Sequence, residues 1–288
     1  MPNNSCPSAP VALQVLGSGG PIAEGRAATS YLLRIDGVPR LLIDAGAGSF
    51  TRYGEAGATL TALDAIVITH LHTDHVGDLI GLLTSGSFED RTDSLPVYGP
   101  AGGGRFPGIA AFLQTELDPK KGAFRFQSGY LDGSDGKPKL AVTQVPTSGG
   151  DAPMQRVDLP HGIALTLVPV HHGEVPAFGV VITARGKTIV IGGDQSRFSE
   201  AFAARLAGSH PDLLIAHHVI PEGEGQPTGL HRSPTSIGEL AAQLGTRRLI
   251  LSHNMSRSLD RLDEGLRAIR GKFAGPVTVA NDLDCYAP

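Results

Sequence analysis

Short apolar runs separated by polar turns dominate the chain, and five of them end beside a residue type that binds metal ions. Runs of this length are typical of buried strands. They cover residues 65–68, 165–170, 188–191, 213–216 and 249–252, and are followed by His70, by His171 and His172, by Asp194, by His217 and His218, and by His253. In layered α/β folds, functional groups gather beyond the carboxyl ends of the strands. The pattern therefore predicts one sheet edge that holds a metal site.

The beginning of the chain is also typical of strands, which we expect at residues 11–16, 30–35 and 40–43. The glycine loop at 17–21 follows the first of these strands. A dinucleotide-binding loop would need glycine at position 22, where Ile22 stands, so this sequence does not favour a nucleotide site. Asp44 ends the third run, and we interpret it as orienting a neighbouring loop, with metal binding as the alternative.

Apolar residues at helical spacing follow the strands, and residues 101–160 are richer in glycine and proline than the rest of the pattern. We expect helices near residues 50–56, 77–83, 109–117, 200–207, 235–244 and 260–273. Ser233 and Pro234 are typical of an N-cap and a first helical position. Glycine and proline are frequent in 101–160, which we interpret as an inserted or elaborated segment of one domain spanning 1–288. Its basic residues are interpreted as a solvated face, with contact to an anionic substrate as the alternative: Arg105, Lys120, Lys121 and Arg125.

The densest chemistry lies in the stretch from His70 to His75, which holds three histidines and one aspartate. Side chains of an extended strand repeat every two residues, so His70 and His72 point the same way. Imidazole is the commonest metal ligand near neutral pH. Asp74 and His75 fall at the turn into a helix, where they could serve a second ion.

Composition limits the function classes. The chain of 288 residues is 41% hydrophobic, which suits a large core, and its formal charge of -4 gives no basic field for a long polyanion. We therefore do not expect nucleic acid as a partner. No apolar window reaches the length of a membrane span, and the N-terminus lacks the features of a signal peptide, so we expect a cytoplasmic protein, although a removed targeting segment would leave no trace. Cys6 and Cys285 are interpreted as free thiols.

These motifs resemble the metallo-β-lactamase fold superfamily of binuclear metal hydrolases. The resemblance rests on the His70-x-His72-x-Asp74-His75 motif and on later ligand types at strand ends, and it covers nearly the whole chain. The His231-Arg232-Ser233-Pro234 loop and the strand end at 251–253 resemble the branch that includes ribonuclease Z and related phosphodiesterases. The resemblance implies an α/β (α+β) fold, a four-layer αββα sandwich of two mixed sheets flanked by helices. Homodimers are common for this fold.

The resemblance also implies a set of ligands. His70, His72 and His172 would hold one ion, Asp74, His75 and His253 would hold the second, and Asp194 would bridge them. His171 is the rival of His172, which we prefer because the stretch after it resembles the third ligand loop of the family. His217 and His218 match no family ligand and are interpreted as structural, with a place in the lining of the pocket for one of them as the alternative. His161 and His210 are expected at the surface.

A site that holds two divalent ions through histidine and carboxylate ligands is typical of enzymes that hydrolyse esters, so we expect this reaction. Zinc is the default, and manganese or iron also fits such ligands. We expect an anionic small-molecule ester as substrate and favour a phosphodiester, with Asp74 orienting the nucleophile and His231 supplying a proton to the leaving group. An aryl sulfate ester hydrolase and a transfer RNA processing endonuclease are the alternatives. Two other classes are not favoured. A flavin-coupled di-iron oxidoreductase on this scaffold would need an additional flavin-binding domain, which we do not expect from this sequence. A non-catalytic scaffold would be expected to have lost metal ligands, whereas every ligand position here is filled.

Overall fold

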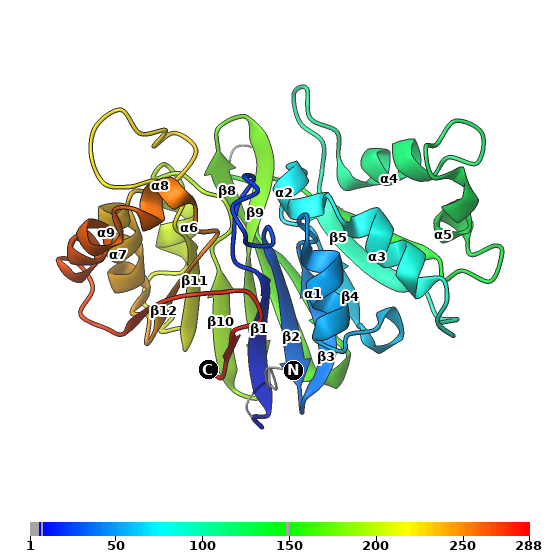
Figure 1. Cartoon of the computed structure of the whole chain (residues 1–288), viewed down its shortest axis with the longest axis horizontal. Coiled ribbons are helices and arrows are strands. Elements are labelled where there is room, and N and C mark those ends of the chain that lie inside the picture. The colour runs from blue at the N-terminus through cyan, green and yellow to red at the C-terminus, as the bar shows by residue number, and fades with distance from the viewer. Residues whose placement is uncertain (1–5, 7, 148–149) are drawn as a thin grey trace.

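Two seven-stranded β-sheets form the centre of the molecule (Figure 1). The computed structural model describes residue 6, residues 8–147 and residues 150–288. The first sheet has the order β14 (Cys285–Tyr286), β1 (Val11–Gly17), β2 (Ser30–Ile35), β3 (Val38–Ile43), β4 (Ala65–Val67), β5 (Leu95–Pro100), β6 (Leu140–Val145). The second has the order β13 (Val277–Val279), β12 (Leu249–Ser252), β11 (Leu213–His217), β10 (Lys187–Ile191), β9 (Val175–Ala184), β8 (Ile163–His172), β7 (Gln155–Leu159).

Each sheet has an antiparallel part and a parallel part. Strands β1, β2 and β3 pair antiparallel, whereas β3 to β6 pair parallel. In the second sheet β7 to β10 pair antiparallel and β10 to β13 pair parallel. The carboxyl ends of the parallel strands in one sheet lie at the same edge, and this is the edge at which the sequence predicted the site.

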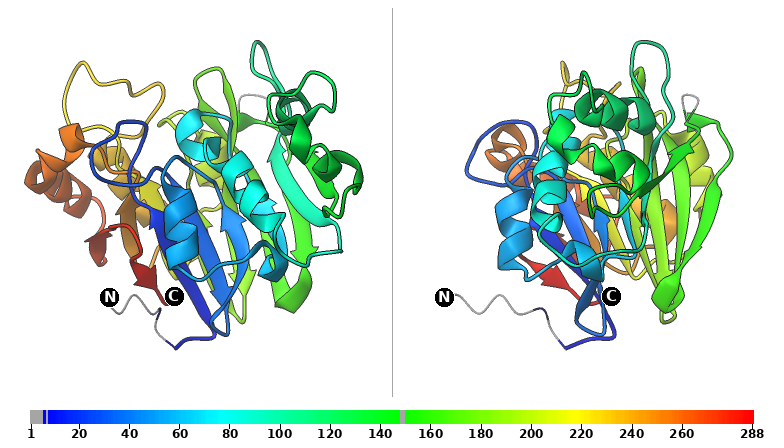
Figure 2. Two further views of the ribbon diagram at one scale, coloured as in Figure 1. Left: turned by 45° about the vertical axis from the view of Figure 1, so that its right-hand side comes forward. Right: turned by 90° about the vertical axis from the view of Figure 1, so that its right-hand side faces the viewer.

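Helices cover the outer face of each sheet, so that the layers follow the order αββα (Figures 1 and 2). On the first sheet lie α1 (Ser49–Glu55), α3 (Leu79–Gly86), α4 (Ile109–Leu117) and α5 (Gly129–Asp132). On the second lie α6 (Glu200–Arg205), α7 (Pro234–Leu244) and α9 (Leu262–Arg270). The shorter helices are α2 (Thr73–Val76), α8 (Ser256–Leu259), η1 (Leu60–Ala62), η2 (Arg125–Gln127) and η4 (Pro160–Gly162). The predicted four-layer sandwich of two mixed sheets is confirmed.

Burial on both faces explains why the central strands read as continuous apolar runs. In β2, Tyr31 and Leu33 point into the core between the two sheets, whereas Leu32 points into the core under the helices. In β3, Leu41 and Ile43 face the other sheet and Leu42 faces the helices. Each side chain therefore finds an apolar partner on whichever side its position in the strand places it.

Most predicted elements lie where the pattern put them, with three differences. The stretch after His172, which resembles a ligand loop of the family, belongs largely to β9, which joins β8 through a two-residue turn, since His172 pairs with Val175. Gly173 has φ of 59°, a left-handed conformation that suits glycine in such a turn. The expected helix at 260–273 is the shorter α9, and α8, which was not expected, lies just before it. The region 101–160 includes β6 and β7, the edge strands of the two sheets.

The two cysteines form a disulfide, so the interpretation of Cys6 and Cys285 as free thiols is wrong. Their separation of 279 residues gives no hint of a pair in the sequence. The fold explains the contact, because β14 pairs with β1 and places Cys285 opposite Gln14, near the beginning of the chain. In the part of the chain that the structure describes, no helix is long and apolar enough to cross a bilayer.

Removing this disulfide should destabilise the protein. A cross-link that closes a long loop restricts the unfolded chain, and such bonds typically add about 2–4 kcal/mol. The double variant Cys6→Ser/Cys285→Ser should lose that amount of unfolding free energy, measured by urea denaturation. Reduced wild-type protein is the matched control and should equal the variant. An unchanged midpoint in both samples would contradict a stabilising role.

Candidate metal centre

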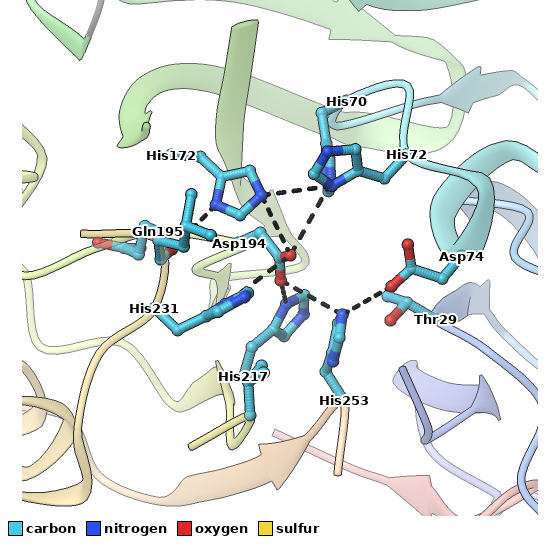
Figure 3. A network of polar contacts seen from close by, with 12 residues as sticks. Thr29, His70, His72, Asp74, His172, Asp194, Gln195, His217, His231 and His253 are labelled. Carbon is cyan, nitrogen blue, oxygen red and sulfur yellow. Dashed lines mark hydrogen bonds and ion pairs between the residues drawn. The ribbon is translucent and has the colours of Figure 1, made fainter. Parts of the chain in front are cut away.

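The side chains that the sequence placed at strand ends meet at one edge of the two sheets. Helix α2 and the end of β8 lie at this edge (Figure 1). They form two groups whose possible ligand atoms lie within 4.8 Å of one another in each group. Figure 3 shows Asp194 in the middle, with imidazoles around it. The first group is His70, His72, His172 and Asp194, and the second is His75, Asp194, His217 and His253.

The first group joins the end of β4 to the end of β8. His70 Nε2 lies 3.0 Å from His72 Nδ1, as expected for two side chains on the same side of an extended segment. His172 Nε2 lies 3.5 Å from Asp194 Oδ2, and His70 Nε2 lies 3.9 Å from the same oxygen. The three imidazoles and one carboxylate therefore converge on a small volume, as the ligands of a metal ion must.

The second group uses the other side of the same carboxylate. Asp194 Oδ1 lies 2.6 Å from His217 Nδ1 and 3.4 Å from His253 Nε2. Asp74 belongs to this side as well, because its Oδ2 is 3.1 Å from His253 Nε2 and 3.7 Å from His75 Nε2. Asp194 presents Oδ2 to the first group and also to His75, at 3.8 Å, and presents Oδ1 to His217 and His253. One carboxylate is thus shared by both groups, as expected of a bridging ligand.

Three neighbouring groups fix the orientation of the rings. Asp44 Oδ2 lies 2.7 Å from His75 Nδ1, and its oxygens also accept bonds from the backbone and hydroxyl of Thr69. The carbonyl of Leu230 is 2.9 Å from His172 Nδ1, and the hydroxyl of Tyr31 is 3.1 Å from His217 Nε2. Such contacts select the tautomer and direct the other nitrogen of each ring toward the centre. Asp44 therefore has the orienting role that the sequence favoured for it.

An orphaned nitrogen supports a metal site. Within the described residues, His75 Nε2 is buried and has no hydrogen-bond partner. A buried polar atom without a partner carries a cost of about 1–3 kcal/mol, which a bound cation would remove. The residues present therefore fit two divalent metal ions.

Charge at the centre is arranged for cations. Burial lowers the pKa of His70 well below its usual value and that of His217 to about 4, so both rings are neutral at pH 7. Burial opposes ionisation of Asp74, but His253 and His75 together outweigh it and lower the pKa to about 2. Burial likewise disfavours the charge on Asp194, yet the surrounding imidazoles, with His253 first, hold its pKa well below the usual range. Neutral imidazoles and ionised carboxylates are the forms that bind metal.

His75 and His253 differ from the other rings. Burial opposes their protonation, but Asp44 and Asp194 raise the pKa of His75 to about 9, and Asp194 with Asp74 raises that of His253. In the metal-free protein these carboxylates thus favour a proton on the rings of His75 and His253, at the place where a metal ion would carry the positive charge. Metal binding at this group should therefore release protons.

The other histidines separate into distinct environments. His171 turns away from the centre, with its Nδ1 2.8 Å from Ser196 Oγ and its ring against Phe198, so His172 is the member of the pair that joins the group. His161 pairs with Asp64 far from the centre, and His210 is exposed. His218 is buried, with Nδ1 3.3 Å from Asn254 Oδ1. His217, which the sequence interpretation treated as structural, is part of the second group, and its place at the end of β11 was the available signal.

His231 lies at the rim of the same centre, where its Nδ1 is 3.9 Å from Asp194 Oδ2. Its loop is held from below by Arg232, whose Nε donates to Gln195 Oε1 at 3.0 Å and whose Nη1 donates to Ser236 Oγ at 2.9 Å. Gln195 in turn donates to the carbonyl of Gly192 at 2.8 Å. This chain of bonds ties the His231 loop to the loop that carries Asp194.

The glycine loop after β1 supports the centre from the side of His253. A Cβ added to Gly20 would lie 2.5 Å from His253 Cε1, which is too close for any side chain. The backbone NH of Asn254 also donates to the carbonyl of Ser18 at 2.7 Å. The loop that superficially suggests a nucleotide site therefore packs against a ring of the metal centre.

A cavity of about 370 Å³ opens over the two groups. Its floor includes His72, Asp74, His172, Asp194 and His253, with His231 at the side. The remaining lining residues are Pro21, Thr73, Val219, Leu230, Met255 and Arg257. This volume is at the lower end of the range for small-molecule sites.

Comparisons with known proteins agree with this geometry. Residues 39–254 match the family model described as the beta-lactamase superfamily domain. The chain is 27% identical over 286 residues to a protein named ribonuclease Z from Mycolicibacterium paratuberculosis, covering 95% of this chain and 96% of that protein. The metallo-beta-lactamase fold protein YhfI from Bacillus subtilis aligns with a TM-score of 0.70 at 19% identity, covering 97% of this chain and 100% of that one. A diphosphatase from the PhnP family aligns with a TM-score of 0.67 at 19% identity, covering 96% and 98%.

Proposed function

Because this chain belongs to the β-lactamase superfamily and is a hydrolase with a His/Asp metal-binding cluster, we propose that it cleaves phosphodiesters of small molecules. The observation that carries the proposal is Asp194, which faces two ligand groups at once on the floor of a cavity of about 370 Å³. Relatives named ribonuclease Z and a structural neighbour named diphosphatase act on phosphate bonds, and this supports the same reaction class.

The ligand roles follow the two groups. We assign His70, His72 and His172 to one ion and Asp74, His75 and His253 to the other, with Asp194 shared by both. His217 binds Asp194 and Tyr31 through its two nitrogens, so we assign it to orienting the shared carboxylate. When bound, two divalent ions polarise a phosphoester and make water acidic enough to ionise near neutral pH. Zinc is the preferred ion for these nitrogen and oxygen ligands, and manganese or iron also fits them.

Two side chains then handle the water and the proton. Asp74 faces the cavity with an ionised carboxylate, which accepts a hydrogen bond from the attacking water and orients it. His231 lies on the cavity wall, where it donates a proton to the departing oxygen. Burial lowers the pKa of His231 to about 3 in the free protein. An anionic substrate beside the ring opposes this effect, so His231 takes up its proton together with the substrate.

Transfer RNA processing is the second candidate, and the identity to ribonuclease Z favours it. We prefer small diesters because the net charge is -4 and the described residues contain no long basic arm. The segment 101–139 carries both signs of charge, with six basic and four acidic residues, and α4 and α5 pack it against the first sheet. Large RNA ligands usually need an extended field of positive charge. Aryl sulfate esters remain a rival, since they present similar anionic oxygens to metal ions.

A substrate panel tests the proposal. Zinc-loaded protein should hydrolyse bis(4-nitrophenyl) phosphate at least about tenfold faster than 4-nitrophenyl phosphate, 4-nitrophenyl sulfate or a chromogenic lactam, measured as kcat/KM. Protein treated with a chelator is the control and should be inactive until metal is restored. Cleavage of a precursor transfer RNA without turnover of the small diester would select the second candidate instead.

We also propose that the protein works in an oxidising compartment. Disulfides persist in such compartments and are rare in the cytosol, so the Cys6–Cys285 bond opposes the expected cytoplasmic location. Thiol alkylation of rapidly quenched cells, followed by mass analysis, tests this point. Fully alkylated cysteines in the native protein would support the cytoplasm.

A further inference from the structure

One basic residue on the cavity wall has no part in the ligand groups. Arg257 lies in α8 and lines the cavity together with Asp74 and His231. Its Nε donates to the carbonyl of Val219 at 2.9 Å, and its Nη2 lies 3.6 Å from Met255 Sδ. These two contacts hold the exposed side chain against the cavity wall.

The charge of Arg257 is not neutralised by an ion pair. Among the described residues, no carboxylate lies within 4.0 Å of its guanidinium nitrogens. Glu24 attracts the guanidinium through space but forms no ion pair with it, and its carboxylate accepts bonds from the backbone NH and the hydroxyl of Ser256 at 2.9 and 2.7 Å. A guanidinium presents several donors in a planar fork that matches carboxylate and phosphate oxygens. The wall of the cavity therefore offers a ready partner for an anion.

The rest of the wall is apolar. Val219 and Met255 are buried and pack together, while Pro21 and Leu230 complete the apolar lining and remain partly open to solvent. The cavity thus has three parts, namely a floor of ligand residues, an apolar wall and the Arg257 cation. A phosphodiester with two small uncharged arms would use only the floor.

We infer that the substrate is a phosphodiester with an apolar, ring-sized arm that carries a second negative charge, and that Arg257 selects for this charge. The inference rests on the proposed phosphodiesterase activity. Arg257 is a specificity-determining residue, because it lies on the wall and is not assigned to the ligand groups or to proton transfer. Its effect should appear as a preference between substrates that share one leaving group.

Matched substrates isolate this contact. Phenyl 4-nitrophenyl phosphate and its 3-carboxyphenyl and 4-carboxyphenyl analogues all release the same 4-nitrophenolate. Each analogue carries one additional negative charge, at position 3 or position 4 of the phenyl ring. Zinc-loaded wild-type protein should prefer the better carboxylated analogue by about tenfold in kcat/KM, as expected for a charge-assisted hydrogen bond. Arg257→Gln should reduce this ratio to near one while leaving the uncharged substrate within about twofold. Arg257→Glu should reverse the preference.

Arg261→Gln is the matched control, because Arg261 lies just beyond α8, pairs with Glu264 and does not line the cavity. It should retain the wild-type ratio. Equal kcat/KM values for charged and uncharged diesters in the wild type, or an unchanged ratio in Arg257→Gln, would overturn the inference while the phosphodiesterase activity stands.

Calorimetry separates this inference from failure of the proposed function. If no diester turns over, binding of 4-carboxyphenyl phosphate and phenyl phosphate to the zinc-loaded protein gives the same comparison without catalysis. Tighter binding of the carboxylated ligand in the wild type and its loss in Arg257→Gln would support the role of Arg257. Equal binding of the two ligands in both proteins would overturn it.

Discussion

Replacing His231 by alanine should lower kcat by about 10²- to 10⁴-fold for diesters with alkoxide leaving groups, the usual range for a general acid. A 4-nitrophenolate leaves without a proton, so its release should slow by less than about tenfold. The reason is the position of the ring, which is held at the cavity wall and has a buried Nδ1 without a partner among the described residues. A plot of log kcat against the pKa of the leaving group measures the effect and should become steeper in the variant.

Two controls protect this interpretation. The metal content of His231→Ala should equal that of the wild type, because the ring is not assigned as a ligand. His210→Ala, which alters an exposed histidine, should leave both kcat and the slope unchanged. Equal losses for good and poor leaving groups would instead indicate that His231 only shapes the cavity or supports a neighbouring ligand.

Replacing Asp194 by alanine should remove at least one of the two metal ions and most of the activity. Its two oxygens face six imidazoles at 2.6–3.9 Å, including His70 and His172 on one side and His217 and His253 on the other. Loss of this carboxylate removes the shared ligand and leaves neighbouring rings to repel each other when protonated. We expect metal bound after dialysis to fall below about one ion per chain, and kcat to fall by at least about 10³-fold, the larger of the effects that mutagenesis of such charges shows.

Elemental analysis and circular dichroism together check this result. The folded state should persist, because the apolar cores surround the sheets on both faces and do not depend on Asp194. Asp64→Ala is a suitable control, since Asp64 pairs with His161 away from the centre. A variant of Asp194 that kept two ions per chain would rule out the bridging role.

Local sequence pattern predicted the strands and the sheet edge that holds the site, because both depend on short-range rules, whereas the four layers were inferred from the family resemblance. Strands buried on two faces must be apolar throughout, and a strand end must place its next polar residue at the sheet edge. His70, Asp194 and His253 could therefore be brought together in prediction although nearly 200 residues separate the first from the last. Ser233 was predictable for a similar reason, because its hydroxyl accepts the backbone NH of Ser236 as an N-cap should.

Contacts that depend on pairing between distant segments could not be predicted in this way. The disulfide requires β14 to lie beside β1, and no local signal in a two-residue strand indicates that neighbour. The role of His217 depends on Tyr31, which comes from the other sheet and fixes the ring through its hydroxyl. The position of Arg257 on the cavity wall likewise depends on the loop that carries Val219.

The division of the centre between the two sheets has a consequence for folding. His70, His72, Asp74 and His75 follow β4 of the first sheet, whereas His172, Asp194, His217 and His253 belong to strand ends of the second. Ions bound by both sets would act as a cross-link between the layers that the unfolded chain cannot form. Such binding raises stability in proportion to the logarithm of the free metal concentration, by about 2.7 kcal/mol at one hundred times the dissociation constant. The same ions would then serve as part of the core that holds the two halves of the sandwich together.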